Sequence, residues 1–108
     1  MHYVLEKLSN TLEVLAVHPG DARARLASAY LLFHTRNASD FPQELQAQWV
    51  WVMAEMVKFG PVISPSNGDI WVGAVEHTMR RIRNATAVKI AAKIYELHWA
   101  VSSNQRYR

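Results

Sequence analysis

Hydrophobic residues recur every three or four positions along most of the chain, which is the spacing of one face of an α-helix. In the first 17 residues they form one stripe, with glutamates and an asparagine opposite. His18-Pro19-Gly20 ends this pattern, because a residue before proline disfavours helical geometry. A second helix is expected over residues 19–35, with Pro19 and Asp21 in its first turn.

The third expected helix, Pro42 to Lys58, is apolar on both sides. On an ideal helix one side carries Leu45, Trp49, Val52, Met53, Met56 and Phe59. The other side carries the candidate interface, Val50, Trp51, Ala54 and Val57. A helix that is apolar nearly all round is buried in its own domain or covered by a partner. We expect Trp49 in the core, and either another helix of the chain or a partner molecule over Trp51.

A glycine and a proline, Gly60 and Pro61, end this helix. The uncharged residues 61–68 then form the longest expected loop, and we expect part of it to lie against the body of the protein. Asp69 is a candidate cap for a fourth helix over residues 70–83. Trp71 and Val72 would belong to the apolar face of that helix.

The fifth expected helix covers residues 85–102, and its relation to the fourth follows from the positions of two arginines. If the two helices were continuous, Arg80 and Arg83 would fall in line with the buried face of the fifth helix. Burying unpaired guanidinium groups is too costly. The pattern therefore predicts a break near Asn84, with Asn84 as a cap.

These elements predict an all-α fold, a compact bundle of four or five helices. Residues 1–102 would form a single domain, and residues 103–108 a frayed polar tail. No strand-like alternation of any length competes with the helices.

The composition and the motifs leave little room for known chemistry. The chain has no cysteine, which excludes thiol catalysis, disulfides and Cys-ligated zinc. No pair among the five histidines has the i, i+4 spacing of a helical metal site, and no serine stands in a nucleophile elbow. We therefore predict a protein that is not an enzyme, with no catalytic residue, metal ligand or cofactor. His98 is interpreted as a core histidine with one hydrogen bond.

Two features of the sequence argue against a membrane or secreted protein. No apolar run approaches the roughly 20 residues of a membrane span, and the N-terminal pattern carries Glu6 and Glu13, unlike a signal peptide. We expect a cytoplasmic protein without membrane contact.

Charge is distributed unevenly along the chain. Residues 1–76 hold five Lys or Arg against eight Asp or Glu, whereas residues 77–108 hold seven against one. A candidate basic patch consists of Arg80, Arg81, Arg83, Lys89 and Lys93. Such a cluster can neutralise phosphates, and its position before a break and a further helix faintly suggests a helix-turn-helix. However, residues 85–88, which would read the bases, include one polar side chain, so a solvated basic face is the simpler interpretation.

The segment Thr78 to Ala91, with the pattern T-M-x-x-I-R-N-x-T-x-x-K-I-A, resembles one found near the end of small uncharacterised bacterial helical proteins. The proline-led stretch Pro42-Gln43-Glu44-Leu45 is similar to an upstream helix of that group. The resemblance covers about a third of the chain. It implies a small bacterial all-helical protein and no particular activity.

Three functional hypotheses follow. The first is a non-enzymatic helical protein–protein interaction module, a small regulator or inhibitor that self-associates, with a homodimer as the commonest form. It would bind a protein partner through its apolar helix face and its basic patch. The alternative is a nucleic-acid-binding regulator that uses the basic C-terminal segment. The third is an enzyme of unrecognised type.

Overall fold

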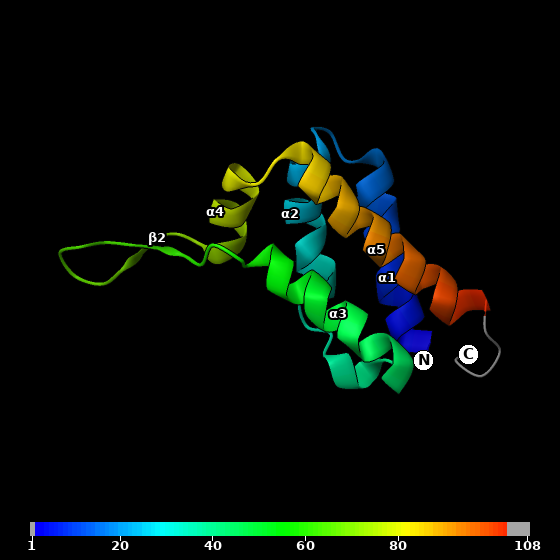
Figure 1. The fold of residues 1–108 in the computed structure, drawn as a ribbon. Coiled ribbons are helices and arrows are strands. Elements are labelled where there is room, and N and C mark those ends of the chain that lie inside the picture. Colours follow the sequence, from blue (N-terminus) through cyan, green and yellow to red (C-terminus); the bar gives the residue numbers. More distant parts are fainter. Residues whose placement is uncertain (1, 104–108) are drawn as a thin grey trace.

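The helices begin and end close to the prolines, glycines and polar turn residues of the sequence. The computed structural model describes residues 2–103, and its α-helices are arranged as a bundle (Figure 1). The elements are α1 (His2–Val17), α2 (Ala22–Phe33), the 3-10 helix η1 (Ala38–Asp40), α3 (Gln43–Met56), the strands β1 (Val62–Ile63) and β2 (Ile70–Val72), α4 (Ala74–Arg81) and α5 (Asn84–Ser103). The predicted all-α bundle is confirmed.

The last helix, α5, is the centre of the packing. Helices α1, α2 and α3 all pack against it, and α1 also packs along α2. The side of α5 that they cover carries Ala87, Ile90, Ile94, Leu97 and Val101, each fully buried. Between the described helices α2 and α3, direct contact is marginal at most. Helices α2 and α3 therefore both pack on α5, and their side chains meet where Phe33 contacts Trp49.

Trp49 lies in the core, as predicted, where it is 1% exposed. Its ring packs edge-on against Phe33, with centroids 5.5 Å apart, and lies 4.8 Å from Phe41. Its indole N–H donates to the backbone carbonyl of Arg36 at 3.0 Å. The tryptophan therefore joins α3 to the end of α2 and to the connection that carries η1.

The second helix starts later than predicted. Asp21 precedes it as the N-cap and accepts a hydrogen bond from the amide of Ala24 at 3.0 Å. Pro19 and Gly20 lie outside the helix, and Gly20 has a φ of +99°, which glycine adopts without the penalty other residues meet. The capping carboxylate, rather than the proline, therefore sets the first turn of α2.

The segment between α3 and α4 differs most from the prediction. Residues 61–68 do not lie against the body, and residues 70–72 are not helical: β1 and β2 form an antiparallel hairpin that projects from the helices (Figure 1). The Ser64 backbone amide donates to the Asp69 backbone carbonyl at 2.6 Å, and the Asp69 carboxylate accepts from the Asn67 side-chain amide at 3.0 Å. Asp69 therefore supports the turn instead of capping a helix, and α4 begins only after Gly73.

The predicted break between the last two helices is confirmed. Helix α4 ends at Arg81, Ile82 is extended and 8% exposed, and α5 begins at Asn84. The break buries Ile82 while leaving Arg80 and Arg83 exposed. Of the predicted tail, Ser103 still belongs to α5, and residues 104–108 lie outside the described part of the chain.

Candidate interaction surfaces

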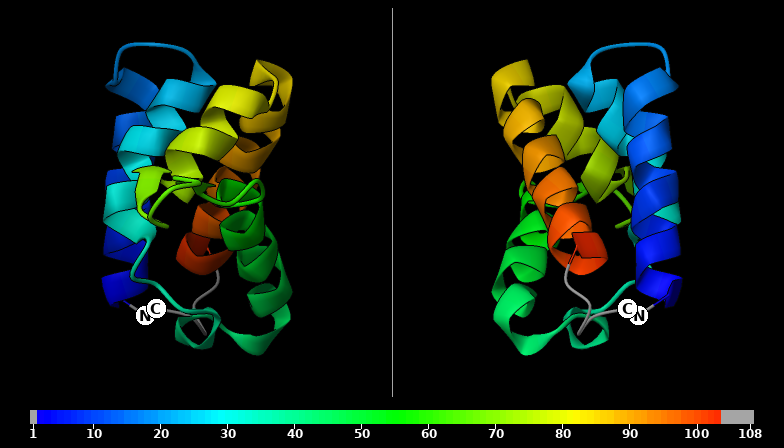
Figure 2. Two further views of the ribbon diagram at one scale, coloured as in Figure 1. Left: turned by 90° about the vertical axis from the view of Figure 1, so that its left-hand side faces the viewer. Right: turned by 90° about the vertical axis from the view of Figure 1, so that its right-hand side faces the viewer.

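The space between α2 and α3 is an open groove, because both helices pack on α5 and touch each other through Phe33 and Trp49. Its upper part, about 700 Å³, lies between α2, the end of α3 and the start of α4, and its lower part, about 450 Å³, lies between α3 and the connection that follows α2. Val57 borders both parts, so we treat them as one α2–α3 groove. Figure 2 (left) shows the ribbons of α2 and α3. Its walls include Ala27, Ser28, Tyr30, Leu31, His34, Arg36, Val50, Met53, Ala54, Val57, Val75 and Glu76.

The walls of the α2–α3 groove are apolar over most of their length. Among the described residues that line it, Arg and Glu occur once each, as Arg36 at the lower part and Glu76 at the upper part. Both are paired: Arg36 lies 3.5 Å from the Asp40 carboxylate, and Glu76 lies 2.6 Å from the Arg80 guanidinium. A ligand in the groove would therefore meet mostly apolar side chains.

The candidate interface predicted on α3 divides into two parts. Val50, Ala54 and Val57 line the α2–α3 groove. Trp51, 40% exposed, is about 100° further around the helix than Val50 and does not line it. All four residues of the candidate interface are exposed, so the described helices leave this second side of α3 accessible, and a partner over it stays a prediction.

The five basic residues of the candidate patch have different environments. Arg80 pairs with Glu76, Lys93 pairs with Glu96 at 2.8 Å, and the Arg81 guanidinium lies 4.5 Å from the centroid of the Phe59 ring. Arg83 and Lys89 are exposed, and neither has an ion pair within the described residues. Local partners therefore already neutralise or cover most of the predicted patch.

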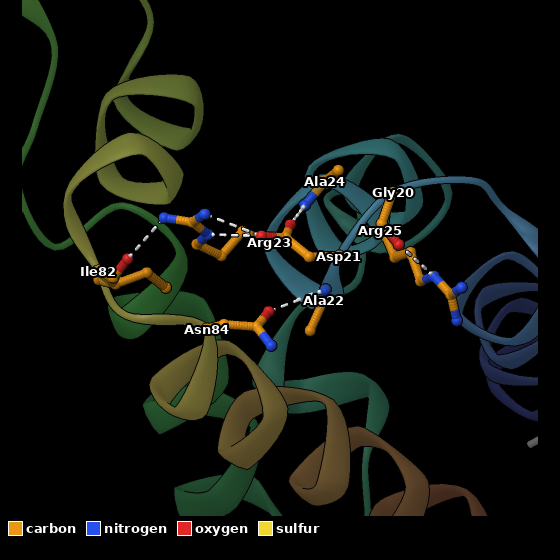
Figure 3. Close-up of polar contacts among 8 residues, drawn as sticks. All are labelled: Gly20, Asp21, Ala22, Arg23, Ala24, Arg25, Ile82 and Asn84. Carbon is orange, nitrogen blue, oxygen red and sulfur yellow. Dashed lines mark hydrogen bonds and ion pairs between the residues drawn. The ribbon is translucent and has the colours of Figure 1, made fainter.

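Polar contacts fasten the α4–α5 break to the start of α2 (Figure 3). The Asn84 side-chain oxygen accepts a hydrogen bond from the Ala22 amide at 3.0 Å, so Asn84 caps α2 across the fold. Arg23 donates to the Ile82 carbonyl at 3.3 Å and pairs with Asp21 at 2.8 Å. The hydrogen bond from the Ala24 amide lowers the pKa of the Asp21 carboxyl, and the hydrogen bond from the Arg23 side chain lowers it further.

A neighbouring depression of about 420 Å³ is lined by the charged side chains of Asp21 and Arg23 at the start of α2 and of Glu76 and Arg80 on α4. Asp21 pairs with Arg23, and Glu76 pairs with Arg80, so these four charges satisfy one another. We assign this cluster a structural role.

A second apolar surface, which the sequence reasoning missed, lies on the outside of α5. Val88, Tyr95 and Trp99 are each about half exposed, and Ala92 lies between them. Their 4-3-4 spacing places all four on one line, opposite the buried stripe of the same helix. We call this line the α5 ridge, and Figure 2 (right) shows that its helix, α5, lies beside α1. The 4-3-4 spacing itself was the signal that could have revealed it.

An apolar depression of about 470 Å³ adjoins the α5 ridge. It lies between α1 and α5, and we call it the α1–α5 groove. Its lining residues are Leu12, Leu15, Ala16, Val88, Ala91, Ala92 and Tyr95. The α5 ridge therefore forms one wall of this groove, through Val88, Ala92 and Tyr95, and α1 forms the other.

The histidines make structural contacts. The His98 ring lies 3.1 Å from the Ser9 hydroxyl, which fits the prediction of one hydrogen bond, and burial lowers the pKa of His98. The His77 ring bonds to the Gly60 carbonyl at 2.8 Å and so helps to hold the end of the α3 turn. Within residues 2–103, no group of three potential metal-ligating side chains is close enough to hold an ion.

Comparisons with models of protein families, with curated proteins and with solved structures find no match to this chain. The resemblance to small bacterial helical proteins therefore stays a prediction. In the described part of the chain, no helix combines the length and the apolar character that crossing a membrane requires.

Proposed function

We propose that the protein is a non-enzymatic helical interaction module, a small cytoplasmic regulator or inhibitor that binds an apolar helical segment of a protein partner in the α2–α3 groove. The observation that carries this proposal is that the groove is apolar, open and lined from two helices and the start of a third. Large apolar side chains left exposed together are typical of interaction sites.

The shape of the groove favours a helix as the occupant. It lies beside two helices that both pack on α5, and a further helix of a bundle would pack in such a place. Amphipathic helices commonly bind such grooves through apolar residues spaced i, i+3 or i+4, and i+7. The wall from Val50 to Val57 is about 10 Å long at 1.5 Å per residue, so it matches two turns of a bound helix.

Exposed side chains at the rim add to this support. Leu31, on the α2 wall, is 74% exposed. Trp71 is 66% exposed and stands two residues before Gly73, which lines the upper part of the groove. Tryptophan is enriched among the residues that dominate binding energy. We propose that Leu31 contributes apolar contact and that Trp71 closes over the bound segment.

A phage-displayed library of 16-residue peptides tests the proposal. Peptides selected on the wild-type protein should share apolar residues at helical spacing. Their affinity should fall about tenfold or more for Ala54→Glu, because a carboxylate in the wall must be desolvated on binding. Ala85→Glu, an equal change at an exposed site that lines neither part of the groove, is the matched control. No enrichment, or equal binding to both variants, would refute the proposal.

The nucleic-acid alternative has less support, because three of its five basic residues already contact partners in the fold. It predicts binding to DNA or RNA that weakens steeply with salt. A filter-binding titration at two salt concentrations, with Lys89→Ser alongside the wild type, tests it. No binding at low salt would end this alternative.

A further inference from the structure

We propose that the outer face of α1 and α5 is a symmetric homodimer interface, in which the α5 ridge of each copy lies in the α1–α5 groove of the other. This inference goes beyond the proposed function, because it concerns the opposite side of α5 from the α2–α3 groove. Each proposal can fail while the other stands. The occupant of this face is therefore a second copy of the same chain.

The arrangement of the face suits a two-fold interface. In such an interface the same patch is used twice, so each projection needs a matching hollow beside it on the same molecule. Tyr95 and Trp99 project from the ridge, with their ring centroids 6.3 Å apart in an edge-on arrangement. Leu12 and Leu15 are partly buried beside them on α1 and line the adjoining hollow. The two features lie side by side, as self-complementarity requires.

Charge selects one orientation of the two copies. Lys89 lies on the edge of the α5 ridge that faces away from α1, and Glu13 lies on the outer edge of α1. Both are exposed, and neither has an ion pair within the described residues. The apolar face is thus bordered by a cation on one side and an anion on the other.

The positions of Glu13 and Lys89 along the helix axes differ by little more than one turn. Helices α1 and α5 run in opposite directions (Figure 1), and Ser9 contacts His98 at 3.1 Å. Glu13 therefore lies level with Ile94, about 7 Å along the helix axis from Lys89, a distance that a lysine side chain can span. A two-fold axis parallel to the helices keeps this level and exchanges the two edges, which brings Lys89 of each copy to Glu13 of the other. An axis across the helices would set like charges against each other, so complementarity favours the parallel axis.

The available area is sufficient for a stable dimer. The exposed fractions of Val88, Tyr95 and Trp99, with the smaller side chains of the groove, amount to roughly 500 Å² of apolar surface per copy. With the charged rim the face reaches about 800 Å² per copy, which is the size of a standard specific interface.

Sedimentation velocity of the purified full chain tests the inference. The wild type should be a dimer at about 100 µM, and Tyr95→Glu and Ala92→Glu should each raise the dissociation constant at least tenfold or so, because both put a carboxylate into the apolar contact. Circular dichroism checks that each variant is folded. The groove variant Ala54→Glu, on the other side of α5, should stay dimeric.

The charge pair provides a test that a folding defect cannot imitate. Glu13→Lys and Lys89→Glu should each weaken the homodimer, since each creates two like-charge contacts. An equimolar mixture of the two variants should form a heterodimer, because every contact then joins opposite charges. A monomeric wild type, a dimer insensitive to Tyr95→Glu, a dimer lost in Ala54→Glu, or single variants without recovery on mixing would each overturn the proposal.

Discussion

Two buried threonines allow one substitution to be tested in two settings. Thr11 and Thr78 are both fully buried, yet their hydroxyl groups have opposite roles. The Thr78 hydroxyl accepts a hydrogen bond from the Phe59 amide at 3.1 Å, whereas the Thr11 hydroxyl donates to the Lys7 carbonyl at 2.8 Å. Valine has nearly the same shape as threonine and lacks the hydroxyl. The comparison therefore isolates the contribution of each hydrogen bond.

The two replacements should have different costs. Thr78→Val leaves the Phe59 amide without its acceptor in a partly buried turn, and the loss should be about 1 to 2 kcal/mol. Thr11→Val removes a donor from a carbonyl that already accepts the helical bond of residue 11, so the free energy of unfolding should change by less than about 0.5 kcal/mol. For a domain of this size, each kcal/mol lowers the melting temperature by about 4 °C.

Urea denaturation followed by tryptophan fluorescence and by circular dichroism measures both values. The midpoint should fall for Thr78→Val, while the slope of the transition stays constant, since the native surface is unchanged. If both variants lose the same free energy of unfolding, or if Thr78→Val unfolds like the wild type, the role assigned to the hydrogen bond from the Phe59 amide to Thr78 is wrong.

Three further changes probe the core, the fastening and the pH response. Ile94→Ala should cost about 2 to 5 kcal/mol through the cavity it leaves, whereas Val88→Ala should change stability little; urea denaturation compares them. Asn84→Ala should cost about 1 kcal/mol, because the Ala22 amide loses its cap, and Asn10→Ala, on the exposed side of α1, is the control. Burial lowers the pKa of His98 below 6.5, so the unfolded chain takes up a proton at this histidine more readily than the folded protein does. The contribution of the neutral ring to stability is therefore complete above pH 6.5 and is lost as the pH falls. When unfolding is measured from pH 7.5 to 5, the free energy of unfolding of His98→Gln should fall less steeply than that of the wild type.

Local signals predicted the helical part of the fold well. The break at Asn84 followed from the cost of burying Arg80 and Arg83, and the structure has it within two residues of that position. Trp49 was recognised as a core residue because its neighbours at helical spacing were apolar. These inferences depend on the spacing of residues within one helix, which can be read directly from the sequence.

The hairpin was missed because Asp69 followed by Ile70, Trp71 and Val72 imitates a capped amphipathic helix. The turn formed by Ser64 to Asp69, with Gly68 at a φ of +78°, competes with that helix and prevails. β-Branched and aromatic residues also favour strands. The spacing of apolar residues alone does not show whether the turn or the helix is more stable in this segment.

The candidate surfaces were only partly predictable. Val50, Ala54 and Val57 were identified as needing cover, yet their neighbours across the groove, on α2 and on the segment after it, depend on how α2 and α3 pack on α5. The α5 ridge is hard to recognise in the sequence because Lys89, Lys93 and Glu96 lie next to it on the outward side of the same helix. Surfaces built from several elements require the packing itself, which no single segment specifies.

Helix α5 follows, in the chain, the elements that it holds together. During synthesis on the ribosome, the apolar sides of α1, α2 and α3 emerge before the helix that will cover them. The closing step of folding must therefore wait until this last segment has left the exit tunnel, and the earlier helices need shelter from aggregation meanwhile. A chain that ends before Asn84 should therefore expose these apolar sides and aggregate more readily than a chain that includes α5.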